Sequence, residues 1–167
     1  MSSMGAHTTC CTDLRQPDTP LKGILSATNR ILLSVRSSEA GARRVGDLLA
    51  DRLRRSGFTV STDANAGYDA RLNISYGEMP YREPYTLMLQ RSQRVAVLQV
   101  ESLVAKSVEF SYELIHPTIG LLARDTLRLD PDPKVMGDSF LEENWARDEF
   151  ETKHLSRVSN AIVHALR

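Results

Sequence analysis

The chain has 167 residues, of which 41% are hydrophobic and 25% are charged, enough for one domain with a sizeable core. Lysine plus arginine and aspartate plus glutamate both number 21, so the formal net charge is zero. This balance argues against a strongly basic nucleic-acid-binding protein. No apolar run reaches the roughly 18 residues that a transmembrane helix needs. We therefore expect neither a nucleic-acid partner nor a transmembrane segment.

Residues 1–28 are predicted to form a flexible N-terminal arm, followed by a single α+β domain at 29–167. The arm has little apolar periodicity, and the two prolines of "RQPDTP" resist regular structure. Its start lacks the basic and apolar regions of a signal peptide. The chain is expected to be periplasmic or membrane-tethered if a signal sequence has been removed, and cytoplasmic otherwise.

The only cysteines, Cys10 and Cys11, are adjacent in this arm. Neighbouring cysteines rarely bridge each other, because their Cα atoms lie too close for a relaxed disulfide. With His7 they lack the further ligands that a zinc site requires, so no metal is predicted here. Lipidation of Cys10 or Cys11 after loss of a signal sequence is a further hypothesis.

The first half of the domain is predicted to begin with a strand and a helix. "NRILLSV" at 29–35 is an apolar run of strand length. Ser37 or Ser38 is expected to cap the following helix, with Glu39 in its first turn. Gly57 is expected just past its end, because glycine adopts a left-handed conformation without strain. The helix presents one apolar face, formed by Val45, Leu48, Leu49 and Leu53.

The exposed side of this helix is basic. Pairs four residues apart are expected between Arg43 and Asp47 and between Asp51 and Arg55. The arginines are interpreted as a solvated face, with an acidic partner or the acidic start of the last helix as the alternative; they are Arg36, Arg43, Arg44, Arg52, Arg54 and Arg55. Gly41 and Gly46 do not form a nucleotide-binding fingerprint, so no cofactor is predicted. Gly46 is expected to let the helix pack closely on the sheet.

The clearest strand lies in "GYDARLNISYGE" at 67–78. Its apolar side chains fall on one parity, and a shift by one residue would bury charged ones. "SVEFSYEL" at 107–114 alternates in the same way, and "FTVST" is a short strand before them. Residues 85–101 resemble two strands joined near Arg91 to Gln93, with a helix left open as an alternative.

The remainder is predicted to be a long connection and a helix. Residues 116–138 contain three prolines, and connections of this length often belong to binding or disorder. A short element is an alternative within it, over "IGLLARDTLRL". A helix is expected over 139–166, with Ser139 and Glu142 at capping-box spacing. Its two apolar stripes do not align, which predicts a bend near Glu151 or Thr152.

Candidate catalytic groups do not form a constellation. Glu151 and His154 have the E-x-x-H spacing of di-iron sites, but the second motif and the additional helices are missing. His116 and His164 are interpreted as a strand-exit residue and a helix-end residue. No catalytic residue is assigned, and the chain is expected not to be an enzyme.

A tyrosine-rich segment, "YGEMPYREPY", is the candidate for partner binding. Tyrosine is favoured at interfaces because it combines a rigid apolar ring with a polar tip. The residues predicted to contact a partner are Tyr76, Tyr81, Arg82 and Tyr85. Local packing of these rings in a strand-linking loop is the alternative.

The order of elements through "VGDLLADRLRRSGFTVSTDANAGYDARLNISYGE" resembles small bacterial cell-envelope lipoprotein domains. These include the lipopolysaccharide-assembly lipoprotein and the curli-secretion-type domains. The resemblance extends over roughly residues 29–166. It implies two helices on one face of a mixed sheet, no enzymatic activity, and binding to another envelope protein or a lipid-linked glycan.

Taken together, the sequence predicts an α+β domain: a mixed, mostly antiparallel sheet of about four to six strands with two helices packed on one face. The expected function is a non-catalytic protein-binding or assembly module of the bacterial cell envelope. Recognition would use the tyrosine segment, the 116–138 connection or an exposed strand edge. The alternative is a small enzyme or ligand-binding protein with its site between the first helix and the sheet.

Overall fold

The computed structural model describes most of the chain beyond the first 22 residues. The backbone is described over 23–25, 27–81, 85–91, 94–100, 105–131, 134–136 and 144–167. Side chains are described over 23–25, 27–81, 105–131 and 144–167. The predicted arm and its cysteines therefore lie almost wholly outside the described residues.

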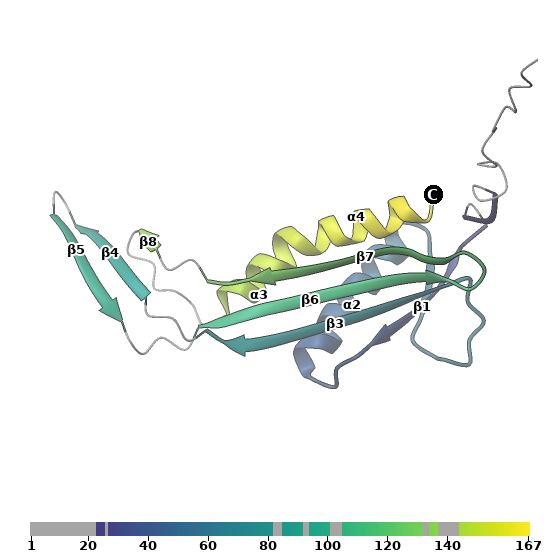
Figure 1. Cartoon of the computed structure of the whole chain (residues 1–167), viewed down its shortest axis with the longest axis horizontal. Coiled ribbons are helices and arrows are strands. Elements are labelled where there is room, and N and C mark those ends of the chain that lie inside the picture. The colour runs from purple at the N-terminus through teal and green to yellow at the C-terminus, as the bar shows by residue number, and fades with distance from the viewer. Residues whose placement is uncertain are drawn as a thin grey trace, which may run out of the picture.

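Five strands form the main sheet in the order β2-β1-β3-β6-β7 (Figure 1). They are β1 (Arg30–Val35), β2 (Thr59–Ser61), β3 (Ala70–Pro80), β6 (Lys106–His116) and β7 (Gly120–Leu129). β1 pairs in parallel with both β2 and β3, whereas the long β3–β6 and β6–β7 pairs are antiparallel. The predicted α+β class with a mixed sheet is confirmed.

Two helical segments cover one face of this sheet. The first is α2 (Ala40–Arg55). The second is C-terminal and consists of α3 (Trp145–Glu149), the π-helical turn η1 (Phe150–His154) and α4 (Leu155–Ala165). Side chains from both segments and from four of the strands form one buried cluster. The wider π turn changes the register of the buried stripe at the point where the sequence predicts a bend.

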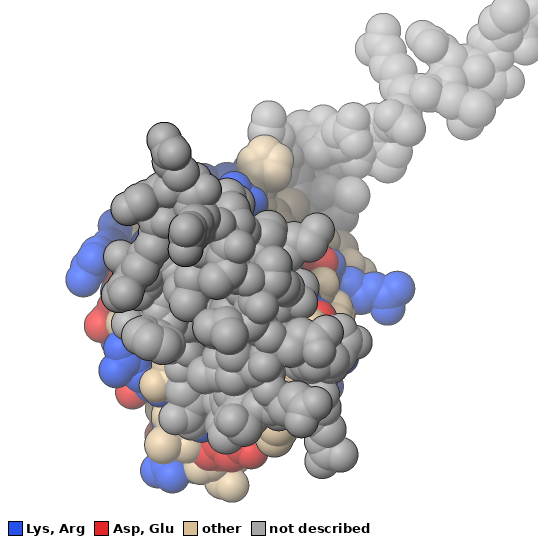
Figure 2. All heavy atoms as spheres, turned by 90° about the vertical axis from the view of Figure 1, so that its left-hand side faces the viewer, with Lys and Arg blue, Asp and Glu red and all other residues tan. Residues whose placement is uncertain are grey.

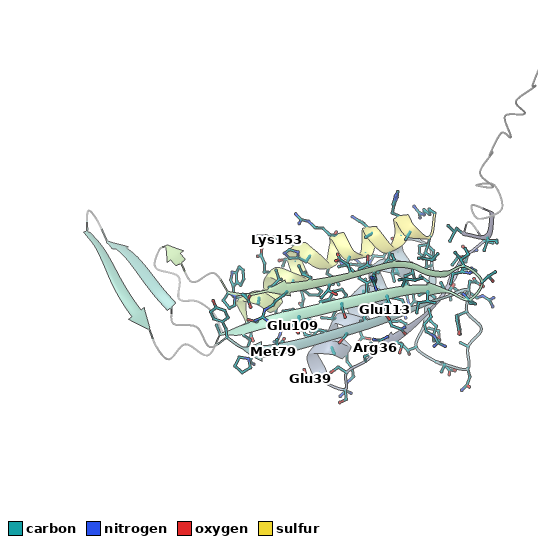
Figure 3. The ribbon with its side chains drawn as sticks, in the orientation of Figure 1. Arg36, Glu39, Met79, Glu109, Glu113 and Lys153 are labelled. Carbon is teal, nitrogen blue, oxygen red and sulfur yellow. The ribbon has the colours of Figure 1, made fainter. Side chains whose placement is uncertain are left out.

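The alternation of β3 and β6 is confirmed by burial. Ala70, Leu72 and Ile74 are fully buried, and Val108, Phe110, Tyr112 and Leu114 of β6 lie on the same face. The intervening residues face the other way and form a polar surface that neither helix covers. Figure 3 shows Glu109, Glu113 and Arg36 on this side of the ribbon.

The start of α2 differs from the prediction. Glu39 occupies the N-cap position, and neither Ser37 nor Ser38 caps the helix. The Ser37 hydroxyl instead accepts a hydrogen bond from the Glu39 N–H at 3.2 Å, which closes a turn before the helix begins. At the other end, Gly57 has a φ of 97°, as expected of the residue after a helix.

The predicted ion pairs on α2 were wrong in their partners. Asp51 pairs with Arg54, three residues on, at 2.9 Å, and not with Arg55. Arg43 donates to the Ser38 carbonyl at 2.9 Å, and no Arg43–Asp47 pair forms. Both partners of each predicted pair are solvent-exposed, so side-chain entropy decides among competing acceptors of similar strength.

The long connection predicted at 116–138 contains a strand, at the place where a short element was predicted. β7 occupies ten of these residues and pairs with β6 along its whole length. A tight turn joins the two strands, and Gly120, where β7 begins, has a φ of 93°. The prolines that indicated a loop lie before and after the strand, where they break no ladder hydrogen bond.

A second, three-stranded sheet has the order β5-β4-β8. β4 (Tyr85–Arg91) and β5 (Arg94–Val100) are antiparallel, which confirms the two-strand interpretation of 85–101 over the helical one. β8 (Lys134–Met136) pairs in parallel with β4. Figure 1 shows this sheet beyond the ends of β3 and β6.

Gly46 provides a test of how closely α2 lies on the sheet. A Cβ atom added at Gly46 would lie 2.9 Å from Val35 Cγ2 and 3.7 Å from Ile74 Cδ1. We expect Gly46→Ala to lower the free energy of unfolding by about 1–3 kcal/mol, because the helix must move away from β1. Urea denaturation measures this change.

The matched control is Gly77→Ala in β3, where an added Cβ meets no atom within 4 Å. This variant should leave the stability unchanged or raise it by up to about 1 kcal/mol. Equal stability of the Gly46 and Gly77 variants would contradict the close approach of α2.

Candidate functional site

The free edge of β1 is the first feature of the candidate site. β2 pairs with β1 only at Arg30, Ile31 and Leu32. Beyond Leu32 the chain of β2 turns away, so the second half of β1 has no described strand on that side. An unpaired strand edge presents backbone donors and acceptors that another strand can use.

The directions of the backbone groups follow from two hydrogen bonds on the opposite side of β1. The Arg30 carbonyl accepts from Asp69 N–H at 2.8 Å, and Arg36 N–H donates to the Ile74 carbonyl at 2.9 Å. Even-numbered residues of β1 therefore point toward β3. Because successive residues of a strand alternate, Leu33 and Val35 point their backbone groups toward the side that β2 occupies only as far as Leu32, and Val35 lies beyond the paired part.

A groove of about 600 Å³ lies along this edge. Leu33 and Val35 contribute from the side that faces α2, and Leu32 and Ser34 from the opposite side. The other walls come from α2 (Arg43, Gly46 and Asp47), from the loop that follows β2 (Thr62 and Ala64) and from β3 (Arg71). Because residues of both faces line it, the groove occupies the plane of the sheet, where one more strand would lie.

Three charged side chains surround the groove. Asp47 is exposed, and no hydrogen bond or ion pair joins its carboxylate to a described residue. Arg43 donates to a backbone carbonyl, and Arg71 donates to the Tyr68 hydroxyl at 2.9 Å while lying 5.4 Å from the centre of that ring. The groove thus combines an apolar strand edge with both signs of charge.

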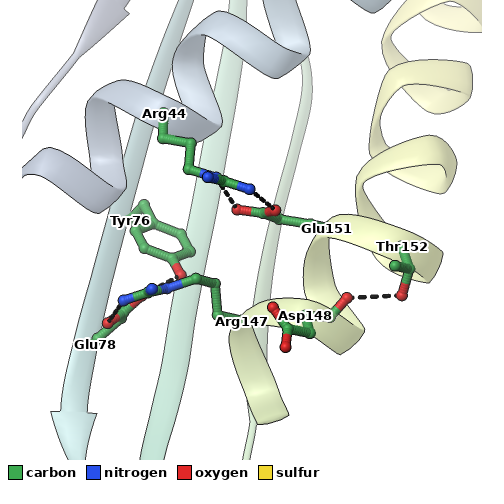
Figure 4. Close-up of polar contacts among 7 residues, drawn as sticks. All are labelled: Arg44, Tyr76, Glu78, Arg147, Asp148, Glu151 and Thr152. Carbon is green, nitrogen blue, oxygen red and sulfur yellow. Dashed lines mark hydrogen bonds and ion pairs between the residues drawn. The ribbon is translucent and has the colours of Figure 1, made fainter. Parts of the chain in front are cut away.

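A cluster of polar side chains joins the C-terminal helical segment to β3 and α2 (Figure 4). Arg147 of α3 donates to both carboxylate oxygens of Glu78 at 2.5 and 2.6 Å, and the Tyr76 hydroxyl donates to the same carboxylate at 2.8 Å. Arg44 of α2 donates to both oxygens of Glu151 at 2.8 and 2.9 Å. Bidentate pairs of this kind fix geometry as well as charge.

Titration in the cluster follows from these contacts. The Arg147 guanidinium, with help from the Tyr76 hydroxyl, holds the pKa of Glu78 below its usual range. Burial, together with the adjacent carboxylate of Glu78, raises the pKa of Tyr76. The Glu78 carboxylate is therefore ionised at neutral pH, where it balances Arg147.

An aromatic contact lies next to the cluster. Phe150, the first residue of the π turn, is fully buried. Its ring centre lies 4.9 Å from that of Phe110 and 5.7 Å from that of Tyr76. Tilted rings at these distances attract each other beyond the area that they bury. The C-terminal segment is thus joined to β3 and β6 by both apolar and ionic contacts.

Of the four residues predicted to bind a partner, the structure describes the side chains of two, Tyr76 and Tyr81. Tyr76 is only 2% exposed, because its ring packs in the core, and this removes it from the predicted set. Tyr81 is half-buried. The side chains of Arg82 and Tyr85, like Cys10 and Cys11, lie outside the described residues, so their predicted roles stay predictions.

His116 and Glu151 have structural contacts. Nδ1 of His116 accepts the Thr118 N–H at 3.1 Å and closes the β6–β7 turn. Glu151 binds Arg44, the alternative that the sequence left open for the basic helix, and His164 is exposed. Within the described part of the chain, no three His, Cys, Asp or Glu side chains gather as metal ligands.

At one end of the molecule, the described residues that are visible carry both signs of charge. Viewed from the end where β3 leaves the main sheet, the visible rim of described residues carries both basic and acidic side chains (Figure 2). Among the helices that the structure describes, none is both long and apolar enough to cross a bilayer.

No protein-family model matches the chain, and no curated protein matches it. Among solved structures, the chain is similar to a PDZ domain protein from Parabacteroides distasonis, at 12% sequence identity and a TM-score of 0.39. The match covers 78% of this chain and 32% of that one, so the chain spans about a third of that protein's length. A similarity this distant supports no inference about activity or partners.

The ionic cluster makes stability depend on pH. Glu78→Gln should lower the free energy of unfolding at pH 7 by about 1–3 kcal/mol, because it leaves the Arg147 cation without its carboxylate. Since the folded-state pKa of Glu78 lies below the ordinary 4.5, its contribution is present above pH 4.5 and is lost as the pH falls through the lowered value. Denaturation curves between pH 3 and 7 measure both effects.

Glu113→Gln is the matched control. Glu113 pairs with Arg36 at 2.9 Å, but both side chains are exposed (Figure 3). Its effect should be about 0–1 kcal/mol. If both variants had the same stability at pH 7, Glu78 would not hold the C-terminal segment in place.

Proposed function

We propose that the chain is a non-catalytic protein-binding or assembly module that accepts an extended segment of its partner at the free edge of β1. The observation that carries this proposal is the groove in the plane of the sheet beside Leu33 and Val35. A partner segment would lie beside the second half of β1, in line with β2, which ends at Ser61. Main-chain hydrogen bonds to Val35 would give affinity, as in other cases of strand addition.

Side chains on the two faces of the groove would select the partner. On the helix side, an added strand would pack next to Leu33 and Val35 of β1 and Gly46 of α2. On the opposite side it would lie near Leu32 and the guanidinium of Arg71. A segment with apolar residues on one face and an acidic residue on the other fits these surroundings.

We further propose that the partner is another protein of the bacterial cell envelope. This step is supported by the resemblance of the helix-and-strand order to envelope lipoprotein domains, and by two helices on one face of a mixed sheet. A lipid-linked glycan is the second partner class that the resemblance implies. Fractionation of cells that express the chain from its own gene tests this step separately, and recovery only in the cytosol would reject it.

A ligand-binding function for the same groove is the second candidate. Its volume of about 600 Å³ falls within the range of small-molecule sites. Asp47, Arg43 and Arg71 supply the few polar groups that such sites use for orientation. A small ligand would not require the outward N–H of Val35, and this difference separates the two candidates.

Val35→Pro tests strand addition directly. Proline removes the outward N–H but leaves the bonds to β3, which come from the even-numbered residues. Linear peptides selected from a displayed library on the wild-type chain serve as the probe. We expect Val35→Pro to weaken their binding at least tenfold, as measured by fluorescence polarisation.

Val35→Ala is the matched control, because it also shortens the side chain but keeps the N–H. It should retain most of the affinity, and thermal unfolding shows whether both variants remain folded.

Arg43→Glu in the groove is compared with Arg55→Glu, which is exposed on the same helix but lies outside the groove. Equal loss with proline and alanine would favour the ligand-binding candidate, and unchanged binding with proline would reject strand addition.

A further inference from the structure

The opposite edge of the main sheet is formed by β7, which is last in the strand order. It is ten residues long and pairs with β6 on one side only. No strand among the described residues pairs with its outer side. This edge is longer than the free part of β1 and does not belong to the groove described above.

The side chains of β7 fall on two faces that the pairing with β6 defines. Arg124, Thr126 and Arg128 lie opposite Glu113, Ser111 and Glu109 on the polar face. Asp125 and Leu127 lie opposite Tyr112 and Phe110 on the helix face. Arg124 is exposed and makes no hydrogen bond or ion pair with a described residue.

Charge restricts how a second copy of the chain could pair with this edge. Two antiparallel β7 strands related by a twofold axis place residues of the same face opposite each other. An axis through Arg124 or Asp125 would oppose two like charges, and an axis through Thr126 would place Arg124 opposite Arg128. An axis through Leu127 instead places Arg124 opposite Asp130 of the second copy.

Asp130 can accept this contact. It follows β7 directly, is 42% exposed, and already accepts from the Ser107 hydroxyl at 2.6 Å and from Arg128 at 3.0 Å. A carboxylate has room for further donors beyond these. In this register each copy contributes one Arg124 and one Asp130, so two opposite-charge pairs form across the axis.

A groove lies at the same axis residue. Leu127 borders this groove of about 360 Å³ between the sheet and the C-terminal helical segment, whose other lining residues are apolar or aromatic (Phe110, Tyr112, Val158 and Ala161) or polar (Asp125, His154 and Arg157). With the axis at Leu127, the Leu127 side chain of the second copy would lie beside the mouth of this groove. The charge register and the groove are independent observations, and both are consistent with an axis at Leu127.

We propose that a second copy of the chain pairs with β7 in antiparallel orientation, about a twofold axis at Leu127. The paired strands overlap from Arg124 to Asp130. Such an overlap buries less than the roughly 1,200 Å² of a stable interface, so the dimer is weak and depends on concentration. The β1 edges remain free at the two outer ends of the combined sheet.

Sedimentation velocity over a concentration series tests the dimer. We expect the full chain to shift from monomer toward dimer as the concentration rises, and Arg124→Asp to weaken association at least tenfold. The double variant Arg124→Asp/Asp130→Arg should restore it, because the opposite charges are exchanged. Arg55→Asp, an equal charge change on α2, should have no effect.

Cross-linking tests the register. In a Cys10→Ser/Cys11→Ser background, Leu127→Cys should form an intermolecular disulfide, since a residue on the axis lies opposite itself. Ala123→Cys lies on the same face but away from the axis and should not. A chain that stays monomeric at every concentration, or equal cross-linking through both positions, would overturn the proposal. If the chain is monomeric, the outer edge of β7 would remain available to a strand of another protein.

Discussion

The buried side chains of β3 and β6 pack against two helical segments that come from opposite ends of the domain. Since both segments use the same face of the sheet, the other face must remain polar, and Glu109, Ser111 and Glu113 of β6 are accordingly not in the core. The strand edges, in contrast, are not covered by this arrangement. One-sided packing therefore leaves the edges β1 and β7 as the places where backbone groups are available to another chain.

The C-terminal segment must be held firmly for this packing to persist. Phe150 supplies apolar contact with Phe110, and Arg147 and Glu151 supply ion pairs with the sheet and with α2. The π turn places Phe150 in the core and Glu151 toward Arg44 within two consecutive residues. Such turns often accompany functional sites. Here its described contacts are structural, and they position α2, whose outer side borders the β1 groove.

Sequence reasoning succeeded where a pattern is local and failed where spatial neighbours decide. The alternation of Leu72, Ile74 and Tyr76 predicts β3 correctly, because each side chain has only one face to choose. The short element predicted within 116–138 is β7, but its type was not predicted, because an edge strand buries little and the exposed Arg124 and Asp125 break the alternation. The same lack of local pattern hides the groove, which exists only because β2 ends at Ser61. The Arg147–Glu78 pair joins residues 69 positions apart and leaves no short motif.

The two free edges suit different partners because they differ in length and charge. The free part of β1 is short, lies between α2 and a loop, and offers side-chain contacts on both faces, which favours a specific segment held in a groove. β7 is long, and its charges oppose several self-pairings but complement the one about Leu127. If β7 joins two copies, the β1 grooves lie at opposite ends of one continuous sheet. A partner with two suitable segments would then bind more tightly than one groove allows, provided that its linker spans that distance.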